Sequence, residues 1–335
     1  MNDRPSTRDD QSGDPAPTGR RRGPRRRTVA ILIGVLTVLL VVPAVVIGYA
    51  LNVERSFLSN VNRETEPVPG QSSRPPVWDG KPVNFLLIGS DDQHEGEGGR
   101  ADALMLVQLS GNRQSAYIVS FPRDLYVNVP GHGKNKINSA YSLGGPELAK
   151  QTVAELTGVE IDHTATIDME GFVNLTTELG GVTVDNKHYS KSGEHEFQTG
   201  KITIEGQRAL AYVRERKQLP RGDLDRAERQ RQVVQAIISK GVSPEVITDP
   251  EKFTNFISAV GRNLTVDASL TDERIRDLAL SIRMSPEDIV TMQVPVAGDG
   301  TTEDGQAVVL PDEAGIKTLS DHLRNDTMSD YTPPE

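Results

Sequence analysis

Hydrophobic residues form one long run without charges near the N-terminus and many short runs after residue 82. The long run, Thr28–Leu51, has 24 positions and no charged residue. A helix rises about 1.5 Å per residue, so a helix of this length spans the roughly 30 Å hydrocarbon core of a bilayer. We therefore predict a transmembrane helix over residues 28–51.

Charges on the two sides of this run predict its orientation. Six arginines precede it, at positions 20, 21, 22, 25, 26 and 27, and the first charge after it is Glu54. Because cationic flanks stay in the cytoplasm, we expect a cytoplasmic N-terminus, a cell-membrane location and an extracytoplasmic remainder. The alternative is a cleaved signal peptide, for which Gly48 and Ala50 offer small residues at a cleavage site. The stretch exceeds the usual signal core of about 7–15 residues, which favours a retained anchor.

The short runs after residue 82 alternate between the spacing of strands and that of helices. Strands are expected at Val83–Gly89, Ala103–Leu109, Ala116–Phe121, Ile161–Ile167 and Ile289–Val296. Helices are expected at Pro146–Thr157, Gly171–Leu179, Gly206–Val213, Asp223–Lys240, Pro250–Gly261, Thr271–Met284 and Asp312–Arg324. Such interleaving predicts an α/β domain whose mostly buried sheet is covered by helices.

Composition divides the rest of the chain. Residues 1–27 are rich in Pro, Gly, Ser, Asp and Arg and are expected to form a disordered basic cytoplasmic tail. Residues 52–81, which contain four prolines after position 66, are expected to form an extracytoplasmic stalk. A single folded domain is then predicted over residues 82–325, followed by a disordered tail at residues 326–335.

Charge and residue types exclude several classes of function. The chain has a net charge of −10, and its first 27 residues, with eight Arg and four Asp, carry +4, so the remainder carries −14. An acidic exported domain is not a general nucleic-acid binder. The absence of cysteine excludes disulfides and thiolate metal sites. The six scattered histidines lack H-E-x-x-H spacing, and Ser90 lies outside a G-x-S-x-G motif.

Two aspartates stand beside the first predicted strand pair. Asp91 follows the strand Val83–Gly89, and Asp102 precedes the strand Ala103–Leu109 after a polar loop. Open α/β sheets bind ligands at the carboxyl ends of strands, and the loop allows Asp102 to fold back toward Asp91. Two carboxylates so placed suit Mg²⁺, which takes oxygen ligands and keeps waters and substrate phosphates. The alternative is that both aspartates cap turns.

A second polar segment follows the strand Ala116–Phe121. Arg123 comes after Pro122, which fixes the local backbone, and Lys134 and Lys136 follow in a glycine-containing run. This run does not match a P-loop, because it lacks the four-residue gap and the Lys-Ser/Thr ending. Both lysines are candidates to face an anion, and a solvated loop is the alternative.

The most unusual segment is a cationic stretch inside the acidic domain. Residues 208–231 hold eight cations, at Arg208, Arg214, Arg216, Lys217, Arg221, Arg226, Arg229 and Arg231, against four acids. Arg226, Arg229 and Gln230 share a helix face by their spacing, and Arg214 and Arg216 share a face if the chain there is extended. Arginine matches phosphate oxygens, and helix N-termini favour anions. A phosphate site is therefore one interpretation, and a salt-bridged solvated helix is the other.

Together these segments resemble the LytR-CpsA-Psr family of cell-envelope proteins. The motifs occur in order between about residues 82 and 240: Phe85–Asp91, Arg100–Asp102, Phe121–Asp124, Val129–Gly131, Lys136–Tyr141, Gly144-Gly145, Leu179–Val182, Tyr212–Arg216, Asp223, Arg226, Arg229 and Gln230. The short inner tail and the single predicted span also fit. The resemblance implies one α/β domain with a mostly mixed central sheet covered by helices on both faces.

The resemblance also implies a transferase for anionic glycopolymers such as teichoic acid, arabinogalactan or capsule. Such enzymes take a polymer from a polyprenyl pyrophosphate carrier in the membrane and join it, through a phosphodiester link, to a muramic-acid hydroxyl of peptidoglycan. Asp91 and Asp102 would hold Mg²⁺, or Mn²⁺, at the pyrophosphate. Phosphate oxygens would be bound by Arg100, Arg123, Arg214, Arg216, Arg226, Arg229 and Gln230, with Lys136 as a further substrate-binding residue. Asp223 would hold an arginine in position, and no nucleic acid is expected as a partner.

The sequence leaves three points open. Many relatives carry a cation two residues after the first aspartate, where this chain has Gln93, so one lesser phosphate contact is in doubt. The general base is unassigned, since Asp91 and Asp102 qualify only if metal does not occupy them fully. The alternatives to a transferase are a polyprenyl-pyrophosphate pyrophosphatase and a non-catalytic envelope binding or regulatory module.

Overall fold

The computed structural model describes residues 62–63, 80–91 and 99–334. The predicted cytoplasmic tail, the predicted span at residues 28–51 and most of the predicted stalk lie outside these ranges. Within them, no helix combines the length and the apolar content that crossing a membrane requires.

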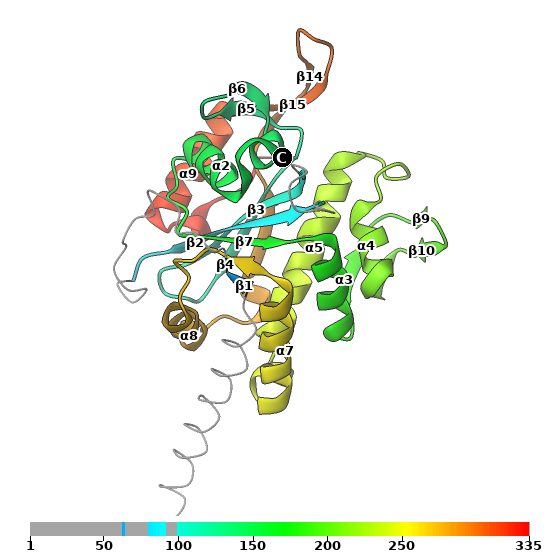
Figure 1. Cartoon of the computed structure of the whole chain (residues 1–335), viewed down its shortest axis with the longest axis vertical. Coiled ribbons are helices and arrows are strands. Elements are labelled where there is room, and N and C mark those ends of the chain that lie inside the picture. The colour runs from blue at the N-terminus through cyan, green and yellow to red at the C-terminus, as the bar shows by residue number, and fades with distance from the viewer. Residues whose placement is uncertain (1–61, 64–79, 92–98, 335) are drawn as a thin grey trace, which may run out of the picture. The chain divides into compact units, whose positions relative to one another are not determined.

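The described residues form a central seven-stranded sheet (Figure 1). In spatial order its strands are β1 (Asn62–Arg63), β12 (Thr265–Val266), β7 (His163–Ile167), β2 (Val83–Ser90), β3 (Ala101–Leu109), β4 (Ala116–Phe121) and β13 (Ile289–Gln293). The pairs β1/β12, β2/β7 and β4/β13 are parallel, and the other three are antiparallel. The sheet is therefore mixed, as the resemblance implied.

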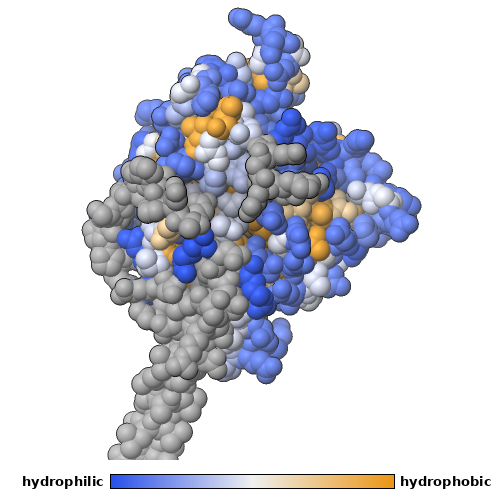
Figure 2. Space-filling model, in the orientation of Figure 1, coloured by the Kyte–Doolittle hydropathy of each residue, from blue (hydrophilic) through white to orange (hydrophobic). Residues whose placement is uncertain are grey.

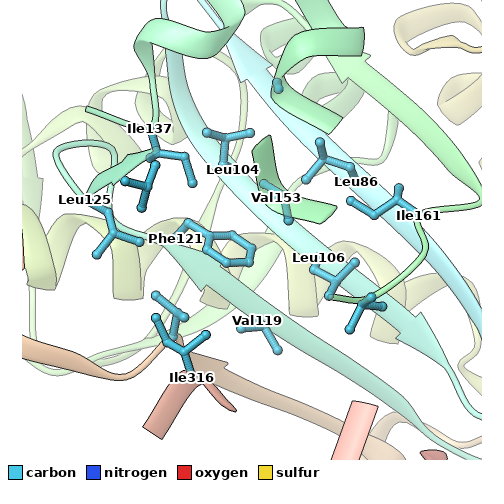
Figure 3. Close-up of a cluster of buried hydrophobic side chains, with 14 of the residues drawn as sticks. Leu86, Leu104, Leu106, Val119, Phe121, Leu125, Ile137, Val153, Ile161 and Ile316 are labelled. Atoms are coloured by element: carbon cyan, nitrogen blue, oxygen red, sulfur yellow. The ribbon is translucent and has the colours of Figure 1, made fainter. Parts of the chain in front are cut away.

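Helices cover both faces of this sheet. On one face α2 (Ser139–Thr157) and α9 (Glu313–Asn325) pack on a cluster that includes Leu106 and Phe121 (Figure 3). The other face meets α5 (Asp223–Gly241) and α8 (Asp272–Ser281). A central strand between two layers must be apolar throughout, and in β4 every residue is buried. The predicted α/β domain with helices on both faces is thus confirmed.

A second core lies beside the sheet. It contains the hairpin of β8 (Val182–Asn186) and β11 (Gly200–Ile204), with β10 (His195–Phe197), which pairs with β9 (Ser190–Ser192). It also contains α3 (Met169–Glu178), α4 (Gly206–Arg214) and α7 (Pro250–Asn263), and a short α6 (Pro244–Ile247) precedes α7. Val233 of α5 packs in this core, while Val234 and Ile238 pack under the sheet, so α5 joins the two cores.

Two further hairpins lie together near one end of the sheet. One joins β5 (Tyr126–Val129) to β6 (Gly133–Lys136), and the other joins β14 (Val296–Thr301) to β15 (Ala307–Pro311). The N–H of Val309 donates to the carbonyl of Asp124 at 2.9 Å, which fastens the second hairpin to the first. In Figure 1 the β14–β15 hairpin projects away from the sheet.

Most predicted elements are present within a few residues of their expected bounds, and the differences have local causes. α2 begins at Ser139 rather than Pro146, because Gly144 and Gly145 take non-helical angles and let the chain kink before the proline. β13 ends at Gln293 rather than Val296, where the β14–β15 hairpin begins. The hairpins outside the sheet were not predicted, because their strands have only three to six residues, too few for a reliable periodic signal even where β8 alternates.

The folded part extends beyond the predicted 82–325 at both ends. Asn62 and Arg63, within the expected stalk, form β1, and Arg63 Nε donates to the carbonyl of Leu270 at 3.4 Å. After α9, a 3₁₀ turn at Met328–Asp330 buries Met328 in the core, where a disordered tail was expected. These two contacts supply apolar and hydrogen-bonding partners that the composition of either segment does not indicate.

Candidate active site

A β-bulge at the end of β2 determines where Asp102 points. The register of β2 against β3 shifts between Gly89, which faces Ala103, and Ser90, which faces Ala101. Asp102 is therefore the extra residue of β3, and such a bulge re-aims a side chain. A Cβ at position 89 would lie only 3.2 Å from the Cβ of Ala103, so glycine gives the bulge the space it needs.

Asp91 stands at the same end of the β2–β3 pair. Its N–H donates to the carbonyl of Arg100 at 3.1 Å, and the N–H of Arg100 donates to Asp91 Oδ1 at 2.7 Å. The side chain of Arg100 is exposed. Residues 92–98, between the two, lie outside the described ranges. The fold thus brings Asp91 and Asp102 to one end of the strand pair.

Arg123 connects this end of the sheet to the start of α5. It follows β4, and its Nη1 donates to Asp102 Oδ1 at 3.0 Å. Its Nε lies 3.3 Å from Asp223 Oδ2 and 3.7 Å from Asp124 Oδ2. Lys136 Nζ of β6 lies 3.0 Å from Asp124 Oδ1. Asp124 was not assigned a role from the sequence, although its position directly after Arg123 was a usable signal.

Asp223 gathers further cations around the same point. Its carboxylate oxygens lie 3.3 Å from Arg226 Nη2 and 3.4 Å from Arg216 Nη1. Gln230, one turn further along α5, places Nε2 at 3.5 Å from the carbonyl of Asp102. We call this set the arginine cluster: Asp102, Arg123, Asp124, Lys136, Arg216, Asp223, Arg226 and Gln230. It draws on five separate segments of the chain.

The charged groups of the cluster shift one another's pKa. Burial would raise the pKa of Asp223, but Arg226, Arg123 and Arg216 together hold it below its ordinary value. Burial would lower the pKa of Arg123, yet Asp223, Asp102 and Asp124 raise it. Burial, and then the charge of Arg123, lower the pKa of Arg226. Arg226 is therefore incompletely compensated, and a further anion beside it is electrostatically favourable.

Arg229 does not join the cluster, contrary to the sequence prediction. Its Nη2 donates to Asn186 Oδ1, the carbonyl of His188 and Ser190 Oγ, each at 2.9 Å. Its guanidinium also lies 4.3 Å from the ring centroid of Tyr212. Arg229 follows Arg226 by three residues, so its side chain is rotated by about 300° around the helix axis and points about 60° away from that of Arg226. The second core, with its acceptors and aromatic rings, lies on that side.

Arg214 lies at the last position of α4 with an exposed side chain, and Glu215 after it is buried. Among the described residues, Arg216 lies in the cluster, whereas Arg214 forms no contact with it. The alternating exposure of residues 214–216 agrees with an extended backbone after the end of α4, and both arginines remain on one side of the chain.

The described residues hold no group of three or more histidine, aspartate or glutamate side chains arranged for a metal ion. Asp91 and Asp102 form a pair, and Mg²⁺ is usually held by one or two carboxylates while phosphates and waters complete its shell. Asp91 Oδ1 accepts from Arg100 and Asp102 Oδ1 from Arg123, so each carboxylate keeps its second oxygen. The donor set therefore fits Mg²⁺ when a phosphorylated substrate supplies the rest.

Known proteins are similar to this chain over most of its length. The family model described as the LytR_cpsA_psr family matches residues 54–325. A Bacillus anthracis protein named polyisoprenyl-teichoic acid–peptidoglycan teichoic acid transferase TagU is 33% identical over 306 residues, which cover 90% of this chain and 97% of the relative. A protein of the same name from Oceanobacillus iheyensis is 37% identical over 229 residues, 67% of this chain and 69% of the relative.

Solved structures share the fold. The crystal structure of Bacillus subtilis TagV superposes with a TM-score of 0.63 at 30% identity, and covers 76% of this chain and 99% of that one. A structure described as TagT bound to LIIa-WTA superposes with a TM-score of 0.61 at 28% identity, and covers 80% of this chain and 99% of the other.

Proposed function

The chain belongs to the LytR_cpsA_psr family, and from this premise we propose that it is a phosphotransferase that moves an anionic glycopolymer from a polyprenyl pyrophosphate carrier to peptidoglycan. Teichoic acid is the polymer in the names of its relatives and is the first polymer to test. The observation that carries the proposal is the arginine cluster, in which partly buried guanidinium groups face one point beside two carboxylates at the end of β2.

The reaction needs charge stabilisation more than covalent catalysis. A hydroxyl oxygen of peptidoglycan attacks the phosphorus that bears the polymer, and a P–O bond forms. The bond from that phosphorus to the bridging oxygen of the pyrophosphate breaks, and polyprenyl phosphate leaves with the bond's electron pair. The hydroxyl proton passes to a base. Negative charge grows on the phosphate oxygens as this happens, so fixed positive groups lower the barrier.

The cluster supplies those groups in fixed positions. Arg123, Arg216 and Arg226 bind the phosphate oxygens, and Asp223 holds all three guanidiniums in place. Lys136 is oriented by Asp124 and adds a further cation, while Gln230 donates to an oxygen from the same helix as Arg226. Arg100 and Arg214 are exposed, and each lies two residues before a member of the cluster, Asp102 and Arg216 respectively. They extend the positive surface toward a large anionic polymer. Arg229 acts at a distance, by fixing α5 against the second core.

Mg²⁺ fits the same proposal. Asp91 and Asp102 would hold it, and it would neutralise charge on the pyrophosphate when bound. Of the two, Asp91 forms no ion pair with a side chain of the described residues, so it is the better candidate to accept the hydroxyl proton. Asp102 is held by Arg123 at 3.0 Å and is the better candidate for a constant ligand.

The hydrocarbon chain of the carrier requires an apolar slot, and the two faces of the sheet differ in this respect. Toward α2, Leu86, Ile88 and Leu104 are 0–2% exposed. Toward α5, Phe85 and Leu87 of the same strand β2 are only partly buried. The face of the molecule in Figure 2 is mainly hydrophilic, with small hydrophobic patches. We therefore place the hydrocarbon chain between β2 and α5, where apolar side chains retain free surface.

A membrane-borne donor also gives a purpose to the apolar run at residues 28–51. We propose that this run is a retained single span, with the N-terminus in the cytoplasm and the domain outside. Such an anchor keeps the cluster at the leaflet where the carrier lies. Released protein would lose access to a lipid-borne substrate.

The test uses the full chain with a polyprenyl-pyrophosphate-linked teichoic acid and a peptidoglycan oligosaccharide. We expect a phosphodiester-linked product from the wild type, and a rate lower by about a hundredfold or more for Arg123→Ala and Asp102→Ala. Lys317→Ala, which alters an exposed residue of α9, is the control and should keep the wild-type rate. Free phosphorylated polymer without a linked product would indicate a pyrophosphatase. Unchanged function of both cluster variants in cells would indicate a non-catalytic module.

Metal removal is a separate test. We expect chelation to abolish transfer, and Mg²⁺ or Mn²⁺ to restore it. Asp91→Ala should raise the Mg²⁺ concentration needed for half-maximal rate, because one of two protein ligands is lost, and should also lower the rate at saturating Mg²⁺, because the proposed base is lost. Full activity of the chelated wild type would contradict the metal assignment and leave the arginine assignment standing.

A further inference from the structure

An open cavity of about 470 Å³ lies at the end of β2 and takes no part in the functions assigned above. It is bounded by the end of β2 at Ser90, by Thr166 of β7, by Tyr141 of α2 and by the first turns of α3. Its volume falls in the range of about 300–1,000 Å³ that is usual for small-ligand sites. Since Ser90 directly precedes Asp91, the cavity opens at the same end of β2 as the paired carboxylates.

The lining is polar and acidic. Asp168 and Glu170 of the α3 N-terminal segment contribute carboxylates, and Asn174 adds an amide one turn later. The cation in the lining, Arg262, is already paired with Glu178 at 2.6 Å. Such a surface repels phosphate polymers and suits a ligand whose hydroxyl and amide N–H groups donate to carboxylates.

Thr166 lines the cavity, but its Oγ1 is inaccessible to solvent, so this hydroxyl does not face a ligand in the cavity. The polar groups that face the cavity are the acidic and amide side chains. Asp168 uses Oδ1 to accept from the N–H of Gly171 at 2.7 Å, and its second oxygen remains for a ligand.

The cavity and the proposed slot for the lipid lie on opposite faces of the sheet. Ser90 and Thr166 continue the face that carries Leu86 and Ile88, since Ile88 is paired with Thr166 in the sheet. This is the α2 face, whereas the lipid slot lies toward α5. A second substrate that enters from the α2 face meets the donor phosphate only at the end of β2.

We propose that this cavity is the acceptor subsite, and that it binds a neutral, hydroxyl- and acetamido-bearing sugar of peptidoglycan. The proposal rests on the proposed transferase function. It places the sugar on Asp168, Glu170 and Asn174, with its reactive hydroxyl directed past Ser90 toward Asp91. The donor phosphate and the acceptor hydroxyl then approach from the two faces of one strand pair.

Steady-state kinetics of the full chain test the subsite. The probes are a polyprenyl-pyrophosphate-linked teichoic acid and an N-acetylglucosamine–N-acetylmuramoyl-peptide oligosaccharide. We expect Asn174→Ala with Glu170→Ala to raise the KM for the oligosaccharide at least tenfold while the KM for the donor stays within twofold. Asn325→Ala, at the exposed end of α9, is the matched control and should change neither.

Direct binding of the oligosaccharide separates the subsite from the proposed function. If the wild type binds the oligosaccharide and the double variant does not, the subsite holds even when no transfer product forms, and the reaction assignment alone fails. If the wild type makes product and the double variant shows unchanged oligosaccharide KM, the subsite is wrong and the transferase assignment stands. A raised donor KM instead would reassign the cavity to the glycopolymer. Far-UV circular dichroism and thermal unfolding establish that each variant is folded.

Discussion

At the scale of single residues, Asp223 links the arginines of the arginine cluster. Its carboxylate contacts Arg123, Arg216 and Arg226, which come from three different segments. Asp223 is not a core residue, because its side chain is 28% exposed. We therefore expect the fold to depend little on it. Asp225, two positions later, is 2% exposed and accepts from the N–H and Nε of Arg221 at 2.8 and 2.7 Å. The two aspartates therefore have different tasks at the start of one helix.

This difference predicts opposite outcomes for one chemical change. Asp223→Asn should lower the transfer rate at least tenfold, because three guanidiniums lose a common anchor, and should leave the unfolding midpoint nearly unchanged. Asp225→Asn should lower the free energy of unfolding by about 1–3 kcal/mol, because a buried carboxylate loses its charged hydrogen bonds to Arg221. Activity assays and urea unfolding on both variants check this. Equal effects of the two changes on rate would mean that Asp223 only supports the fold.

The residue scale also shows where sequence reasoning stops. The types and spacing of Arg123, Arg216, Asp223 and Arg226 predicted a phosphate site, and the fold brings them together. Arg229 has the same spacing signal as Arg226, yet it turns to the second core. Its partners Asn186, His188 and Ser190 lie some forty residues away, and no local pattern reveals them.

At the scale of elements, the buried carboxylate of Asp267, directly after β12, links that strand to β7. Asp267 accepts from the N–H of Thr164 at 2.8 Å and lies 3.3 Å from His163 Nδ1. Burial would raise the pKa of Asp267, but hydrogen bonds from His163, Ser269 and Thr164 lower it from 3.8 to about 2. A carboxyl group with a depressed pKa in the folded state stabilises the fold above the unfolded pKa, and that stabilisation is lost as the pH falls toward the folded pKa.

The lowered pKa of Asp267 therefore predicts that the free energy of unfolding falls in acid. Between about pH 4 and pH 2 the wild type should lose on the order of 2 kcal/mol of stability through Asp267. Asp267→Asn should be less stable at neutral pH and should lose less on acidification, because its side chain does not titrate. Urea unfolding at pH 7, 4 and 3 measures both, with Asp185→Asn, an exposed change on β8, as the control. Parallel pH profiles for wild type and Asp267→Asn would contradict the assignment.

The elements differ in how well the sequence predicted them. Buried strands such as β2 and β4 are short apolar runs, and long amphipathic helices such as α7 carry a clear period, so all of these were predicted within a few residues. The bulge at Gly89 was not, since one extra residue in β3 leaves no mark on apolar periodicity. The hairpins β5–β6 and β14–β15 are short and largely exposed, so their pairing depends on contacts with each other.

At the scale of the whole molecule, the sheet begins before the predicted domain does. β1 pairs with β12, and Arg63 bonds to the carbonyl of Leu270. A chain truncated to residues 80–335 should unfold at a lower temperature than one truncated to residues 54–335. The loss should be on the order of 1 kcal/mol, the contribution of one or two hydrogen bonds. Calorimetry of the two truncated chains checks this, and identical transitions would show that β1 adds no stability.

One consequence of α5 concerns inactivation by heat. This helix carries Asp223, Arg226 and Gln230 for the site, Val233 for one core and Val234 for the other. Because α5 packs in both cores, we expect its N-terminal end, which carries the site residues, to stay ordered while both cores are folded. Many enzymes lose activity below the temperature of global unfolding, because their active sites lie on segments of low local stability that unfold first. Here the loss of activity on warming should coincide with the global transition, and the working temperature range should be limited by the fold itself.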